Sequence, residues 1–208
     1  HDDHEVRKKI QMGLRHGKVD GHCPGLRGDD LLKYVASGIS SDHESTTAEE
    51  AIEKLDAGLQ IYIREGSAAR NLEALLPIVT AENAKKICFC TDDRHPADLR
   101  DEGHIDNIIR KAITLGLDPI LAICIATKHV ADHYGLDKHG VIESERFANF
   151  IVFDDLNQFL VKQTWHHGKL VAQNGGMVRL CSSNVDWSSV KESVHLPTAF
   201  DEHSFCIC

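Results

Sequence analysis

Short apolar runs alternate with amphipathic helical patterns through the first half of the chain. Residues 59–63 and 87–90 are apolar runs of strand length, and apolar positions at helical spacing, such as Ala51, Ile52 and Leu55, separate the runs. Strands that alternate with helices in this way form parallel sheets. The pattern therefore predicts an α/β fold with about four strand–helix units between residues 19 and 116, preceded by a helix at residues 5–16.

Several of the expected helices begin at residues that can cap them. Thr47 and Glu50 have the spacing of a capping box, in which each side chain binds an otherwise unpaired backbone N–H. Asp118 followed by Pro119 predicts a helix that runs to about residue 133. Two further caps are expected, one from Asp29 or Asp30 and one from Ser67.

From residue 141 onward the pattern changes to short strands. Strands are expected at residues 149–153 and within residues 159–171, with turns at residues 154–155 and 167–168. The chain is therefore expected to consist of a partial (β/α) barrel with the catalytic residues, residues 1–135, and a β-rich segment, residues 136–208. A complete eight-fold barrel typically needs about 250 residues, so we expect part of the barrel to be missing from these 208 residues.

Charge and hydropathy exclude several classes of protein. The formal net charge is −9, with 32 acidic and 23 basic residues, which argues against nucleic acid as a partner and favours a small molecule. No apolar segment approaches the roughly 20 residues that span a bilayer, and no charged-then-apolar leader opens the chain. We therefore expect no membrane association and a cytoplasmic location.

The seven cysteines do not have the spacing of a disulfide framework. Cys88 and Cys124 lie in apolar patterns, which is typical of reduced, buried thiols. Cys206 and Cys208 could chelate a soft metal, but two thiols at a chain terminus are more often a coincidence.

Candidate metal ligands recur at the ends of the apolar runs. His22, His43, Glu65 and Asp92 are 21, 22 and 27 residues apart, which is roughly the length of one strand plus one helix. This rhythm places them at the C-terminal ends of successive parallel strands, where (β/α) barrels hold their active sites. Two imidazoles with an anionic oxygen suit a borderline divalent cation, so His22, His43 and Asp92 are predicted metal ligands.

Each of these residues also has an ordinary structural explanation. The chain has 14 histidines, so two could follow strands by chance, although the acidic neighbours Asp42, Glu44, Asp92 and Asp93 favour a metal site. Arg64, Glu65 and Ser67 form a charged group directly after a strand, but the first two could be solvated loop charges and Ser67 only a helix cap. For His104 and Asp106 a surface role is the stronger reading.

The motifs at the strand ends resemble those of the adenine deaminase family of metal-dependent amidohydrolases. The matching stretches are VDGHCPG at residues 19–25, SDHE at 41–44, IREGSAARNLEALLP at 63–77, FCTDDRHP at 89–96 and DEGHID at 101–106. The resemblance implies the C-terminal half of an amidohydrolase-type (β/α)8 TIM barrel, strands 5–8, followed by a small β-sandwich portion. It also implies a dinuclear site that holds divalent Mn, Fe or Zn.

The resemblance also implies a role for each residue that matches a motif. His22 and His43 would be the metal ligands after the fifth and sixth strands, and Asp92 the metal-binding and proton-transferring aspartate after the eighth. Glu65 would be a second catalytic residue, whereas Arg64 and Ser67 would bind the purine. The reaction would be adenine plus water giving hypoxanthine and ammonia, and the full-length form is expected to be a homo-oligomer.

The sequence departs from the family pattern in several places. The family's first-strand His-x-His pair and fourth-strand bridging carboxylate have no counterpart, so we expect little activity from the chain alone. Glu145 stands where related enzymes tend to have glycine, which costs on the order of 1 kcal/mol if the turn needs a positive φ. Two other hypotheses stay open: an amidohydrolase for a cyclic amide or a dipeptide, and a non-catalytic half-barrel that serves as an assembly module.

Overall fold

The computed structural model describes residues 3–178, 186–191, 193 and 195. The chain divides into two compact units, residues 1–178 and 179–208. In the second unit the described residues include one short helix, α9 (Ser188–Lys191). Cys181, Cys206 and Cys208, with much of the predicted segment 136–208 beyond residue 178, lie outside the described residues.

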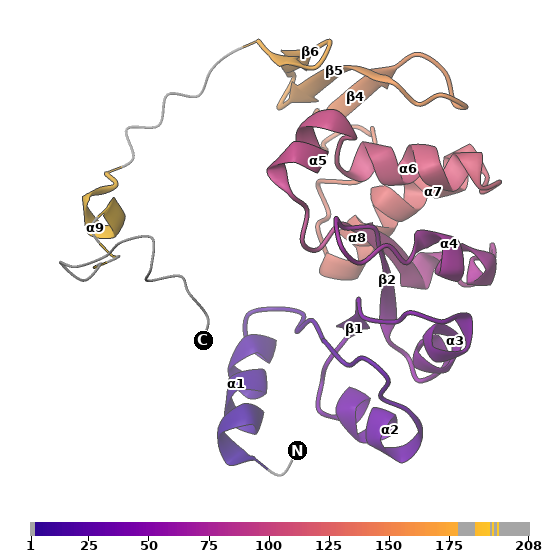
Figure 1. Cartoon of the computed structure of the whole chain (residues 1–208), viewed down its shortest axis with the longest axis vertical. Helices are drawn as coiled ribbons and strands as arrows, with labels where there is room; N and C mark the ends of the chain where they lie inside the picture. Colours follow the sequence, from indigo (N-terminus) through magenta and orange to yellow (C-terminus); the bar gives the residue numbers. More distant parts are fainter. Residues whose placement is uncertain (1–2, 179–185, 192, 194, 196–208) are drawn as a thin grey trace, which may run out of the picture. The chain divides into compact units, whose positions relative to one another are not determined.

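A three-stranded parallel sheet forms the centre of the first unit (Figure 1). Its strands β1 (Ser41–Asp42), β2 (Gln60–Arg64) and β3 (Ile87–Cys90) lie in the order β1-β2-β3. The predicted strand before His22 is reduced to a single parallel bridge between Val19 and Ile39, next to β1. The predicted strand–helix alternation is thus present, with a first strand too short to form a regular ladder.

Helices follow the strands in the predicted alternation. Their bounds are α1 (His4–Leu14), α2 (Gly28–Ala36), α3 (Ala48–Asp56), α4 (Leu72–Leu75), α5 (Pro96–Asp101), α6 (Ile105–Thr114), α7 (Pro119–Ala126) and α8 (Lys128–Tyr134), with 3-10 turns η1 (Leu76–Ile78) and η2 (Ala84–Lys86). The core contains Ile61 and Ile63 of β2, which are fully buried together with Ile108 of α6. Within the described residues, no helix has the length and apolar character needed to cross a bilayer.

The capping predictions are confirmed at two helices. The Thr47 hydroxyl accepts the Glu50 N–H at 3.3 Å at the start of α3, and Asp118 accepts the Leu121 N–H at 2.8 Å at the start of α7. The reciprocal bond of the capping box, from the Thr47 N–H to Glu50, is absent. The Glu50 carboxylate instead accepts hydrogen bonds from the Thr46 N–H and from the Lys54 ammonium on the next turn. The acidic residue expected at this position therefore joins a buried ion pair.

Three helix predictions are wrong. α2 begins after Arg27, so Asp29 and Asp30 lie in its first turn and do not cap it. Ser67 caps no helix, since α4 begins only after Asn71. The helix expected to run to residue 133 is broken at Thr127, whose φ of −130° and ψ of −80° lie outside the helical region.

The β-rich segment forms a four-stranded antiparallel sheet, β4 (Phe150–Phe153), β5 (Val161–His166), β6 (Lys169–Gln173) and β7 (Gly176–Met177). The predicted turn at His167 and Gly168 is confirmed, with both φ values positive at 48° and 72°, as two-residue hairpins require. Strand β7 is missing from the sequence prediction. Glu145 does adopt a positive φ of 67°, so a non-glycine residue occupies that strained turn.

The four cysteines within the described part of the chain are free thiols, as predicted. Cys124 of α7, which was predicted to be buried, is partly exposed, whereas Cys88 of β3 and Cys23 are buried. Burial raises the pKa of both thiols to about 12, so they stay protonated at neutral pH.

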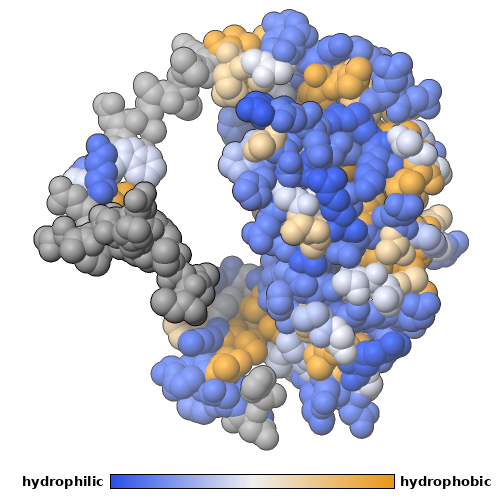
Figure 2. Space-filling model, viewed as in Figure 1, coloured by the Kyte–Doolittle hydropathy of each residue, from blue (hydrophilic) through white to orange (hydrophobic). Residues whose placement is uncertain are grey.

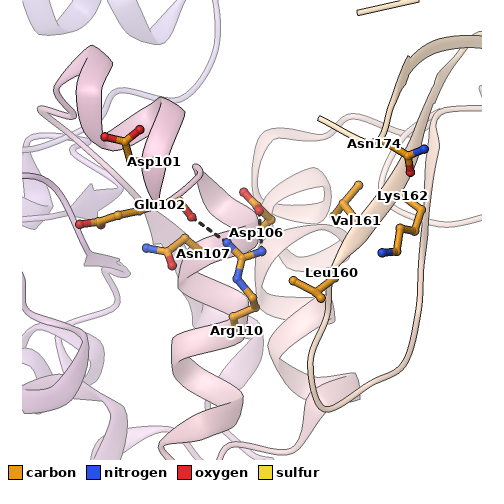
Figure 3. A pocket seen from close by; sticks show the side chains of 9 residues that line it. All are labelled: Asp101, Glu102, Asp106, Asn107, Arg110, Leu160, Val161, Lys162 and Asn174. Carbon is orange, nitrogen blue, oxygen red and sulfur yellow. Dashed lines mark hydrogen bonds and ion pairs between the residues drawn. The ribbon is translucent and has the colours of Figure 1, made fainter. Parts of the chain in front are cut away.

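Arg110 of α6 joins this helix to the connection between β4 and β5 of the antiparallel sheet. Its guanidinium donates to Asp106 Oδ2 at 2.7 Å, to the Glu102 carbonyl at 2.8 Å and to the Phe159 carbonyl at 3.5 Å. The surface over α5 and α6 is largely hydrophilic (Figure 2). Figure 3 shows the hollow beside this arginine, lined by Asp101, Glu102, Asp106, Asn107, Arg110, Leu160, Val161, Lys162 and Asn174.

Replacing Asp106 by asparagine is expected to lower the free energy of unfolding by about 1–2 kcal/mol at pH 7. Burial alone would raise the pKa of Asp106, but hydrogen bonds from the His104 N–H and from Arg110 hold it below its usual range. Such a carboxylate stabilises the fold above its unfolded pKa of about 3.9, and this stabilisation is lost as the pH falls through the folded pKa. The difference between the two proteins should therefore shrink below about pH 4, as urea unfolding at several pH values can measure.

Asp101 provides the control for this prediction, because its ion pair with Arg100 is exposed at the surface. Its replacement by asparagine should change the stability by less than about 0.5 kcal/mol at any pH. An equal loss from both substitutions would contradict the role of Asp106.

Candidate metal and active site

The candidate side chains follow consecutive parallel strands. His22 comes after the bridge at Val19, His43 directly after β1, Arg64 at the end of β2, and Asp92 two residues beyond β3. Because all four positions are at the C-terminal ends of parallel strands, their side chains share one edge of the sheet.

Three donor atoms at this edge form a nearly equilateral triangle. His22 Nδ1 lies 3.4 Å from His43 Nε2 and 3.5 Å from Glu44 Oε1, and the third side, from His43 Nε2 to Glu44 Oε1, is 3.4 Å. The two imidazole rings meet edge to face, with centroids 5.3 Å apart. Below, His22, His43 and Glu44 are called the donor triangle.

The donor triangle fits a divalent cation. Two ligand atoms that lie about 2.0–2.1 Å from a tetrahedral ion are separated by roughly 3.4 Å, which matches all three sides of the triangle. Two imidazole nitrogens with one carboxylate oxygen are also the donor types that such ions prefer. The residues present therefore fit a metal ion by both chemistry and spacing.

Arg64 links the donor triangle to Asp92. Its guanidinium binds both oxygens of Glu44, through Nη1 to Oε1 and at 3.2 Å from Nη2 to Oε2, and donates from Nη1 to Asp92 Oδ2 at 2.7 Å. The Arg64 guanidinium holds the pKa of the Asp92 carboxyl below its usual range. Asp92 thus adjoins the triangle through an arginine and is ionised at neutral pH.

The loop that carries Asp92 is in close contact with the loop after β2. Asp92 has a positive φ of 53°, which is uncommon for a residue with a side chain. The Ser67 N–H donates to the Asp93 carbonyl at 2.9 Å, and a Cβ atom on Gly66 would lie only 2.6 Å from the Thr91 carbonyl oxygen. Glycine at position 66 therefore permits the two loops to approach.

Glu65 and Ser67 are directed to other partners than the donor triangle. The buried Glu65 carboxylate accepts hydrogen bonds from Lys111 of α6 and from the Leu72 N–H, the latter at 3.2 Å. The Ser67 hydroxyl donates to Asp98 of α5 and accepts the His95 N–H at 2.7 Å. Both side chains therefore hold the loop after β2 against neighbouring helices.

Glu44 is a residue of this site that the sequence did not predict as a ligand. The sequence indicated it only as an acidic neighbour of His43, although it lies in the SDHE stretch at residues 41–44. The spacing of strands could not identify it, because it lies one residue beyond the strand-end position and reaches the triangle through the turn of the loop. His104, expected at the surface, lies with its Nε2 3.2 Å from the Thr91 hydroxyl.

Comparison with known proteins gives a consistent family. The model of the amidohydrolase family matches residues 5–171. The chain is 48% identical over 178 residues to an adenine deaminase of Kosmotoga olearia and 44% identical over 195 residues to one of Nitratidesulfovibrio vulgaris strain DP4. These matches cover 85% and 93% of the chain but only 31% and 34% of the relatives, so it spans about a third of their length.

Solved structures with a similar fold have more distant sequences. A β-aspartyl dipeptidase of Fervidobacterium islandicum AW-1 matches with a TM-score of 0.65 at 17% identity, over 86% of this chain and 54% of that one. An N-acetyl-D-glucosamine-6-phosphate deacetylase of Mycobacterium smegmatis matches with a TM-score of 0.63 at 14% identity, over 82% and 53%. At this level of identity the likeness supports a shared fold.

Proposed function

The chain belongs to the amidohydrolase family, and from this premise we propose that it is part of a metal-dependent enzyme that converts adenine and water to hypoxanthine and ammonia. The identity of 43–48% to several adenine deaminases supports the choice of substrate. The observation that carries the proposal is the donor triangle, because its spacing suits a divalent ion at the sheet edge where such barrels hold their active sites.

In this proposal His22, His43 and Glu44 hold a divalent Mn, Fe or Zn ion, and Asp92, which shares the Arg64 guanidinium with Glu44, is the candidate ligand of a second ion. A bound cation of this kind lowers the pKa of water so that hydroxide is available near neutral pH. Asp92 accepts the proton of the attacking water and passes it to the leaving amine. Its side chain is 34% exposed, so water and substrate can reach the carboxylate.

The remaining predicted site residues are given narrower roles. Arg64 neutralises Glu44 and Asp92 and borders the purine pocket. Glu65, predicted to be catalytic, acts by fixing the loop after β2 through Lys111, and Ser67 fixes the same loop through Asp98. These two residues thus influence the purine through the position of that loop.

The proposal also assigns the chain to one part of a complete barrel. The bridge at Val19 and strands β1 to β3 correspond to strands 5–8 of the barrel, so residues 1–135 supply the catalytic half-barrel. Residues 136–208 then supply one part of the flanking β-sandwich, to which β4–β7 belong. A homo-oligomeric full-length form and a cytoplasmic location stay predictions, which sedimentation and cell fractionation can test.

Replacing His43 by alanine tests the metal site. In zinc-finger peptides four ligands share a binding free energy of about 10–16 kcal/mol, so one ligand contributes roughly 3 kcal/mol. Loss of His43 should therefore lower the affinity about 100-fold. Competition with a chelator, using Zn2+ or Co2+, measures this change. The exposed His16 is the matched control, and its replacement by alanine should leave the affinity unchanged.

Metal-binding and activity assays together separate the competing hypotheses. If the chain binds no metal by itself, and none when a partner chain could supply further ligands, the result favours the assembly module. Metal binding by the chain, with release of ammonia from adenine by a protein of the relatives' length that contains it, supports the proposal. Turnover of dipeptides or cyclic amides without turnover of adenine would replace adenine deaminase by another amidohydrolase.

A further inference from the structure

A single buried carboxylate binds the backbone beside both histidines of the donor triangle. Asp42 Oδ1 accepts the Cys23 N–H at 3.0 Å, and Oδ2 accepts the Glu44 N–H at 3.1 Å. Cys23 directly follows His22, and Glu44 directly follows His43. One side chain therefore connects the two loops from which the triangle is built.

Asp42 is in turn fixed by a buried lysine. Lys54 of α3 donates to Asp42 Oδ2 at 2.8 Å, to the Cys23 carbonyl at 2.8 Å and to Glu50 Oε1 at 2.6 Å. The side chains of Lys54 and Asp42 are both fully buried. All three N–H donors of the lysine are used, two by the Asp42 and Glu50 carboxylates and one by the Cys23 carbonyl.

Glu50 extends the same network to the outer parts of both loops. Its Oε1 accepts the Gly25 N–H at 2.7 Å, three residues after His22, and its Oε2 accepts the Thr46 N–H at 3.3 Å. Asp42, Glu50 and Lys54 thus form one buried cluster that makes several hydrogen bonds to each loop. This group is called the buried clamp below.

We propose that the buried clamp sets the spacing of the donor triangle, with Lys54 and Asp42 acting as positioning residues for the metal ligands. The inference rests on the proposed metal site and extends it to residues that touch no metal. Apolar packing of α3 specifies the relative position of the two loops less strictly than directional hydrogen bonds to their backbone do. Removing the lysine leaves the Asp42 and Glu50 carboxylates without their shared cation, and either one takes up a proton or the two move apart, which shifts the loops they hold.

Replacing Lys54 by methionine in this chain tests the proposal. The substitution keeps most of the side-chain volume and removes the charge and the three hydrogen bonds. The affinity for Zn2+ or Co2+, measured by chelator competition, should fall about tenfold, as is typical when a group that orients ligands is lost. In the metal-free protein, the nuclear Overhauser contact between the His22 and His43 rings should weaken or vanish.

Two further variants keep the result interpretable. Ile125 of α7 is fully buried and lies outside the clamp, so Ile125→Ala destabilises the fold without touching the two loops and should keep both the affinity and the ring contact. If K54M does not fold, Ser45→Ala removes only one donor to Asp42, the hydroxyl at 2.9 Å, and should cause a smaller loss in the same direction.

The two readouts distinguish failure of this inference from failure of the metal site. If the wild-type chain binds no metal, the proposed metal site fails, but the ring contact in the metal-free protein still decides the role of the clamp. Wild-type affinity and ring contact in K54M, or in S45A where K54M does not fold, would overturn the inference. Equal losses in I125A and K54M would also overturn it, because general destabilisation would then explain both.

Discussion

Replacing Asp92 by asparagine is expected to lower the turnover of adenine by about 1000-fold or more in a protein of the relatives' length that contains this chain. The amide cannot accept the proton that the carboxylate takes from water. It also replaces the charged partner of Arg64 at 2.7 Å by a neutral one. The fold should persist, because the Asp92 side chain is 34% exposed and its neighbours in the core are unchanged.

Ammonia release from adenine, measured with added Mn2+, Fe2+ or Zn2+, checks this expectation. Asp93→Asn is the matched control, since Asp93 is the next residue on the same loop and is exposed. Its replacement should leave the turnover within a few-fold of wild type. If D92N kept wild-type turnover, Asp92 would be excluded from proton transfer.

Replacing Gly21 by alanine is expected to lower the free energy of unfolding by about 3 kcal/mol. An added Cβ atom would lie 2.3 Å from the Ser41 carbonyl oxygen and 2.6 Å from the Tyr34 hydroxyl. The first is a backbone atom, so rotation of a side chain cannot relieve the clash. The segment that ends in His22 would have to move away from β1, and the donor triangle would open with it.

Urea unfolding measures the loss of stability. Gly176→Ala is the control, because a Cβ atom there would meet its nearest neighbour, the Gln173 carbonyl oxygen, at an ordinary 3.7 Å. That variant should differ from wild type by less than about 1 kcal/mol. A stable G21A protein with intact metal affinity would show that the close approach at Gly21 is not required.

The sequence by itself determined where the regular elements and the candidate ligands lie. Apolar periodicity is a local property, so it located β2, β3 and most helices, and the spacing of His22 and His43 indicated that they meet at one sheet edge. The caps at Thr47 and Asp118 were also readable, because a cap requires only residues three positions apart.

Only the tertiary structure decided which partner each charged side chain binds. Arg64 and Glu65 are adjacent, yet successive strand residues point to opposite sides. Arg64 therefore meets Glu44 and Asp92, whereas Glu65 meets Lys111, which is 46 residues further along the chain.

The buried clamp could not be predicted from sequence patterns either, because tertiary contacts set the partners of its charged side chains. Glu50 and Lys54 have the four-residue spacing of an ordinary exposed helical ion pair. Their burial follows from the packing of α3 against the two loops that Asp42 connects, and those contacts span 12 to 31 residues of sequence. Local periodicity thus specified the elements and the histidines, while long-range packing specified which charges meet, because it alone determines which buried polar groups must satisfy one another.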